Sequence, residues 1–145
     1  MNKALFLGAA LSLVISNSFA AELTNFNDIK AAVLNGKTIH MAINFTKCTT
    51  STHQKFAHFM ANTIGVVTPN VFQVHEDMLI TSITHFTLNH PQFPQRPVQE
   101  YITFRITEEN ELKMTHQSLD AAHYMPISGL MNYTCEIGSD AKVYD

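Results

Sequence analysis

The side chains best suited to chemistry are His85, Glu100, His116 and Ser118, which lie on three neighbouring predicted strands. A carboxylate beside two imidazoles is able to poise a general base, or to coordinate a metal ion through nitrogen and oxygen. The same residue types also form purely structural clusters, because a partly buried charge needs a hydrogen-bonding partner. A structural role is therefore the usual one for such a cluster, and a binding role is the hypothesis that the sequence offers for these four residues.

The proximity of these four residues depends on the register of two predicted hairpins. Register is favoured when apolar residues of paired strands fall on a common face, and a slip of one residue would scatter the cluster. A polar turn at residues 108–110 joins the second and third strands. The favoured pairs are Leu79–Ile106, Ile83–Ile102, His85–Glu100, Ile106–Leu112, Phe104–Met114, Ile102–His116 and Glu100–Ser118.

Motifs of established catalytic sites are missing from the sequence. There is no GxSxG nucleophile motif, no HExxH and no closely spaced pair of cysteines. Only five glycines occur, which disfavours a phosphate-binding glycine loop. His53 and His58 are five residues apart and would point to different sides of a helix, while His40, His75, His90 and His123 are expected in solvent or in loops. We expect no catalytic residues, no metal and no cofactor.

The strand that organises the N-terminal half is Lys37–Cys48. Its apolar residues Ile39, Met41, Ile43 and Phe45 alternate with more polar ones, which is the period of a strand with one buried face. A short helix is predicted before it at residues 25–36, with Asn25 or Asn27 as the N-cap and Gly36 at its end. Residues 49–65 are left open between a helix with Phe56, Phe59 and Met60 on one face and an irregular loop.

Strands dominate the rest of the chain. Residues 90–97 carry three prolines and predict a loop, as do residues 120–129, and Asn110 is expected to adopt positive φ. The predicted strands are 66–75 with a break at Pro69, 78–89, 98–107, 112–119, 130–137 and a short edge at 143–144. The fold class is mainly β: a single antiparallel meander sheet or an open β-barrel, with a short N-terminal helix.

Residues 1–20 have the features of a signal peptide. A positive start is followed by an apolar run over Ala4–Ile15 and by small residues before Ala21, and the run is too short to span a bilayer. Residues 21–145 then form a single domain. Losing Lys3 changes the formal charge from −3 to −4, which argues against nucleic-acid binding. We expect a periplasmic monomer without a membrane span, with secretion beyond the periplasm left open.

Cys48 and Cys135 are the two cysteines of the chain and are 87 positions apart. Thiols of exported proteins tend to oxidise, and the even count favours a disulfide between them. A redox-active pair usually has CxxC spacing, so the predicted role is structural.

Several segments resemble the VirK family of small exported bacterial proteins associated with virulence. The resemblance is carried by NGKTIHMAINFTKC at 35–48, ITSITHFTL at 80–88, PVQEYITFRI at 97–106 and YTC at 133–135, in the order of the family. The segment between Cys48 and Val71 departs from the pattern, being richer in apolar residues. The resemblance implies an exported, virulence-linked role and carries over no catalytic residues.

Three hypotheses of function follow. The first is a disulfide-stabilised, non-enzymatic binding module with an unidentified protein or small-ligand partner. The second is a small periplasmic enzyme or metal-binding protein that uses His85, Glu100 and His116. The third is a closed barrel that holds a lipid or another apolar ligand, although a packed core explains the inward apolar residues at least as well.

Overall fold

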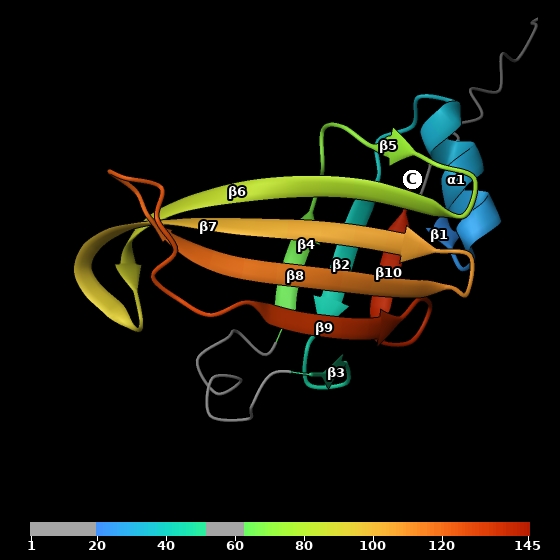
Figure 1. Cartoon of the computed structure of the whole chain (residues 1–145). Helices are drawn as coiled ribbons and strands as arrows, with labels where there is room; N and C mark the ends of the chain where they lie inside the picture. Colours follow the sequence, from blue (N-terminus) through green and yellow to red (C-terminus); the bar gives the residue numbers. More distant parts are fainter. Residues whose placement is uncertain (1–19, 52–62) are drawn as a thin grey trace, which may run out of the picture.

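The computed structural model describes residues 20–51 and 63–145 (Figure 1). The predicted signal peptide, apart from Ala20, and the predicted helical face of Phe56, Phe59 and Met60 lie outside the described residues. The elements are β1 (Glu22–Leu23), α1 (Phe26–Leu34), β2 (His40–Asn44), β3 (Thr49–Thr50), β4 (Thr63–Val67), β5 (Gln73–Val74), β6 (Met78–His90), β7 (Phe93–Thr107), β8 (Glu111–Asp120), β9 (Met131–Glu136) and β10 (Ala141–Tyr144).

The described strands form two antiparallel sheets. The small sheet has the order β1-β10-β2-β4, and the large sheet has the order β3-β9-β8-β7-β6-β5. The mainly β class, the antiparallel pairing and the N-terminal helix are confirmed, and β5 to β9 form the predicted meander. The sheet is not single, however, and no closed barrel is present in the described part of the chain. Two sheets form because both β2 and the large sheet have one apolar face to bury.

The hydrophobic core lies between the two sheets and continues under α1. Figure 1 shows β2, β4 and β10 running across the long strands of the large sheet, with α1 at one end. Each element contributes the alternating apolar residues of its inner face. The fully or almost fully buried members include Ile29, Ile39, Met41, Ile43, Leu79, Phe104, Ile106, Leu112, Met114, Cys135, Ala141 and Val143.

Helix α1 has the caps that the sequence predicts. The Asn25 side chain accepts a hydrogen bond from the Asp28 N–H at 3.0 Å, and Gly36 follows the helix with a φ of 71°. Phe26, Ile29 and Ala32 are its buried residues. None of the described helices is long and apolar enough to cross a membrane.

The β6–β7 hairpin is longer than predicted, and the expected loop at residues 90–97 is wrong. Strand β6 continues to His90, and β7 begins at Phe93, so only Pro91 and Gln92 form the turn. The prolines are tolerated because the ladder is irregular between Thr87 and Asn89, and prolines are found at such bulges and at strand edges. Gln95, with a φ of 63°, lies on the opposing part of β7.

Strand β10 is also placed differently from the prediction of a short edge. It lies between β1 and β2, with Val143 opposite Met41 on one side and Leu23 on the other. The last residues of the chain therefore occupy the middle of the small sheet. Its register to β1 could not be inferred from a hairpin, because the two strands come from opposite ends of the domain.

Candidate functional site

The register of β6, β7 and β8 brings the predicted cluster together. His85 of β6 is opposite Glu100 of β7, and Glu100 is opposite Ser118 of β8. His116 is opposite Ile102, one step along the same face of the sheet. All the pairs predicted from the two hairpins are present, so the register prediction is confirmed. The role of the cluster in binding is a separate matter, which the register leaves open.

The carboxylate of Glu100 is the centre of this site. Its Oε2 lies 2.6 Å from His85 Nδ1, a short hydrogen bond in which the ring donates. Its Oε1 lies 3.6 Å from Nε2 of His116 and 3.6 Å from Nε2 of His90. These two contacts are longer than a hydrogen bond and act through electrostatics. One carboxylate therefore faces three imidazoles.

Burial changes steeply across the cluster. The side chain of His116 is 1% exposed and that of His90 is 8% exposed, whereas Glu100 is 20% and His85 is 61% exposed. Ser118 is buried, and its Oγ lies 3.4 Å from His90 Nε2. The cluster thus begins inside the core and opens to solvent at His85. We call Glu100, its three histidines and Ser118 the Glu100 cluster.

The surroundings of Glu100 favour its ionised form. The imidazole of His116, with that of His85, lowers the pKa of Glu100 from 4.5 to about 2, although burial acts in the opposite direction. Burial lowers the pKa of His90, and Glu100 partly opposes this effect. A carboxylate with so low a pKa is a weak base at neutral pH, where a general base works best with a pKa near the pH of the reaction. The cluster is therefore better suited to hold a hydrogen-bond donor or a cation than to remove a proton.

His116 is the unusual member of the cluster. Neither of its ring nitrogens has a hydrogen-bond partner among the described residues. Buried polar side chains are normally paired, since an unsatisfied group costs about 1–3 kcal/mol. Its position next to Ile102 therefore costs stability, and the electrostatic contact with Glu100 offsets part of this cost.

His90 belongs to the cluster, and the expectation of a solvent or loop position for it is wrong. The residue is buried, and its ring packs against Phe93 with centroids 5.0 Å apart. On β6 the inward residues are odd-numbered up to His85, and the irregularity after Thr87 breaks this alternation. No sequence signal marked that break, because the three prolines indicated a loop instead.

The remaining described histidines lie apart from the Glu100 cluster. His40 Nδ1 is 2.8 Å from Thr68 Oγ1. His123 and Arg96 both contact Asp120, and the Arg96 guanidinium, with His123, holds the pKa of Asp120 well below its usual range. His53 and His58 lie outside the described residues. Within the described residues no group of three or more His, Cys, Asp or Glu side chains is arranged to hold a metal ion.

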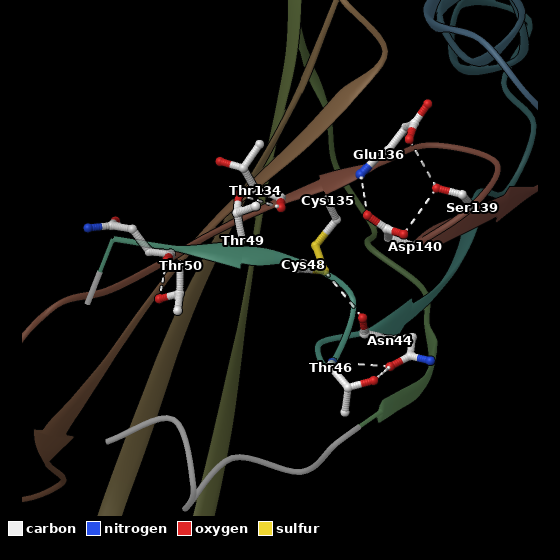
Figure 2. Close-up of a disulfide and its surroundings, with 11 residues drawn as sticks. Asn44, Thr46, Cys48, Thr49, Thr50, Thr134, Cys135, Glu136, Ser139 and Asp140 are labelled. Carbon is white, nitrogen blue, oxygen red and sulfur yellow. Dashed lines mark hydrogen bonds between the residues drawn. A yellow bond between two sulfur atoms is a disulfide. The ribbon is translucent and has the colours of Figure 1, made fainter. Parts of the chain in front are cut away.

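The predicted disulfide is present between Cys48 and Cys135, with Cα atoms 4.5 Å apart. Figure 2 shows Cys48 at the start of the segment that leads into β3, and Cys135 within β9. Next to it, Thr49 and Thr50 pair with Thr134 and Tyr133. The bridge therefore ties the chain that leaves β2 of the small sheet to a strand of the large sheet.

Comparison with known proteins bears on the family and the fold of the chain. The family described as VirK protein matches residues 22–124, which is more than half of the chain. The fold is similar to the crystal structure of lpg1832, a VirK family protein from Legionella pneumophila, with a TM-score of 0.74 and 28% sequence identity over 86% of this chain and 98% of that chain. No curated protein matches the sequence. The chain belongs to the VirK family.

Proposed function

We propose that this VirK family protein is exported to the periplasm, or secreted from it, and contributes to virulence as a non-enzymatic binding module. The partner is a protein or a small ligand that contacts the Glu100 cluster where it opens at His85. The observation that carries the proposal is the ionised, partly buried carboxylate of Glu100, whose pKa of about 2 suits it to hold a partner's donor or cationic group.

The enzymatic alternative receives less support from the same residues. A weak base at neutral pH is a poor acceptor for a substrate proton. Ser118, whose Oγ lies 3.4 Å from His90 Nε2, is buried together with that histidine, so a substrate does not reach its hydroxyl in this structure. Robust turnover by the pure protein, abolished in the Glu100→Gln variant, would overturn the binding proposal.

Affinity capture from the protein's own cell envelope tests the binding role. The bait is the mature, oxidised chain, and the test variant is the double substitution His85→Ala and Glu100→Gln. We expect the parent to retain a defined partner and the double variant to lose it. The matched control is His75→Ala with Glu76→Gln, which makes the same chemical change at an exposed turn before β6. Equal capture by both variants would show that the cluster is structural.

The proposed export to the periplasm is tested separately. Cell fractionation followed by intact mass measurement should find the protein in the periplasm or medium, beginning at Ala21. Retention of residues 1–20 in a membrane fraction would contradict cleavage before Ala21, and a protein found in the cytosol would contradict the export proposal.

A further inference from the structure

Most of β6 forms an open edge of the large sheet. Strand β5 pairs only with Leu79 and Ile80, and the Thr81 hydroxyl donates to the Val71 carbonyl. From Ser82 to Thr87, the described part of the chain places no strand on the side away from β7. Figure 1 shows β5 beside only one end of β6.

This edge has the regular geometry of a paired strand. Residues 78–87 of β6 pair with β7 without a shift in register, and the irregularity begins only after Thr87. In an antiparallel ladder, every second residue directs its N–H and C=O away from the neighbouring strand. Ser82–Thr87 therefore offers alternating backbone donors and acceptors whose natural complement is another extended chain.

The edge also lacks the features that usually prevent such pairing. Natural edge strands are protected by charged residues, above all Lys, by prolines or by a cover. The segment Ser82–Thr87, which ends before the irregularity of the ladder, reads SITHFT and contains no Lys, Arg, Asp, Glu or Pro. A long, uncharged edge would be an aggregation hazard in an exported protein unless a partner used it.

The side chains beside the edge indicate what the added strand carries. On the outer face Phe86 is 54% exposed, and Tyr101 of β7, opposite Thr84, is 46% exposed. Aromatic residues at such positions pack against apolar side chains of a neighbouring strand. On the inner face, the exposed His85 would lie beside alternate residues of the added strand. The edge thus fits an extended peptide with apolar residues at every second position.

We propose that Ser82–Thr87 of β6 binds an extended segment of a partner protein as an added strand, with its apolar side chains against Phe86 and Tyr101. This inference rests on the proposed binding function and names the class of partner. It makes backbone hydrogen bonds the main source of affinity and the outer-face apolar residues the source of specificity.

The test begins with random linear peptides displayed on phage and selected on the mature, oxidised protein. Methylation of single backbone nitrogens in a selected peptide should weaken binding by about tenfold at alternate positions and little at the positions between them. Amide hydrogen exchange in Ser82–Thr87 should slow when the peptide is bound. The proposal would be overturned if no peptide were selected, or if methylation weakened binding equally at successive positions. It would also be overturned if peptide binding slowed amide exchange only outside Ser82–Thr87.

A matched pair of variants locates the binding edge on the protein. Thr84→Lys adds a charge to the open edge and should weaken peptide binding by about tenfold or more. Gln117→Lys adds the same charge on β8, in the same cross-strand row through Tyr101, but β8 already has a neighbour on each side. It should leave binding unchanged. Equal effects of the two variants, with unchanged thermal unfolding, would contradict strand addition.

Three further outcomes test this inference against a dimer and separate it from the function on which it rests. A peptide-free dimer that protects Ser82–Thr87 would identify a second copy as the occupant and overturn the partner-peptide proposal. An envelope partner retained by Thr84→Lys but lost in the His85→Ala and Glu100→Gln variant would leave the binding module standing without strand addition. A partner retained by both variants would overturn both proposals.

Discussion

At the scale of single residues, Glu100 connects the buried and the exposed parts of its cluster. Its Oε2 meets the solvent-exposed His85, and its Oε1 faces the buried rings of His90 and His116. A charge in this position is stabilised by the donors around it and is destabilised by its partial burial. The balance favours the ionised carboxylate, so we expect the free energy of unfolding to depend on pH.

Glu100→Gln should lower the free energy of unfolding at pH 7 by on the order of 2–3 kcal/mol. The folded-state pKa of about 2 is below the ordinary value of 4.5, so the ionised group stabilises the fold above pH 4.5. That contribution is lost as the pH falls from about 4.5 towards 2. Urea unfolding of the parent and the variant should show that the difference between their free energies of unfolding becomes smaller as the pH falls through this range.

Glu76→Gln is the control for the loss of one exposed negative charge, since Glu76 lies in the turn before β6. It should change the free energy of unfolding by less than about 0.5 kcal/mol at every pH. A pH-independent difference between the parent and Glu100→Gln would show that the carboxylate is not stabilised by its neighbours.

At the scale of the elements, the β7–β8 turn does more than reverse the chain. Asn110 has a φ of 61°, and its Oδ1 accepts a hydrogen bond from the Phe26 N–H at 2.7 Å. Its own carbonyl accepts from the Ile137 N–H at 3.0 Å. The turn therefore satisfies a donor in the first turn of α1 and fixes the helix against the large sheet.

Asn110→Ala should lower the free energy of unfolding by about 1–3 kcal/mol, because it removes the acceptor and because Ala adopts positive φ less readily than Asn. Asn110→Gly also removes the acceptor but adopts positive φ without steric cost, so it should cost less, and Asn110→Asp keeps the acceptor and should cost least. Thermal unfolding of the three variants gives the order. A larger loss of stability in Asn110→Gly than in Asn110→Ala would contradict this account of the turn.

The C-terminal strand β10 is a central element of the small sheet. Val143 is fully buried there, and its neighbour Lys142 is exposed, with a long contact to Glu22. Val143→Ala should lower the free energy of unfolding by about 2 kcal/mol through lost apolar burial. Lys142→Ala should change it by less than about 0.5 kcal/mol, because exposed ion pairs contribute little. If urea unfolding gave similar losses of unfolding free energy for Val143→Ala and Lys142→Ala, β10 would behave as an edge strand and not as a central one.

At the scale of the whole molecule, the two sheets are joined by the common core and by one covalent bond. The Cys48–Cys135 disulfide spans 87 positions of sequence and connects the end of the β2 segment to β9. Because a cross-link reduces the conformational freedom of the unfolded chain, a bond across so long a loop stabilises the folded state strongly.

Reduction of the disulfide should lower the free energy of unfolding by on the order of 4 kcal/mol. Urea unfolding with and without dithiothreitol measures the change. The double variant Cys48→Ser and Cys135→Ser should resemble the reduced parent and should not respond to the reductant. An unchanged urea midpoint after reduction of the parent would show that the disulfide does not stabilise the folded state.

The sequence by itself determined the local features of this protein. Alternating apolar residues predicted the central parts of β2 and of β6 to β9, although β2 is only His40–Asn44 within the predicted 37–48, and residues 66–75 are strand only at 66–67 and 73–74. Asn25, one of two predicted N-caps, and Gly36 lie at the ends of α1, and the polar turn at 108–110 set the register of β7 and β8. These predictions succeeded because period, capping and hairpin register depend on residues that are near one another in the chain. The same register placed His85, Glu100, His116 and Ser118 side by side.

Only the tertiary structure decided the features that depend on distant segments. Pairing of β1 with β10 joins opposite ends of the domain and makes a second sheet, and no local pattern encodes that choice. The irregularity after Thr87 turns His90 into the core, since packing there outweighs the tendency of prolines to form loops. The open edge of β6 likewise follows from where β5 ends, because an edge is defined by which strands are absent beside it in the described fold.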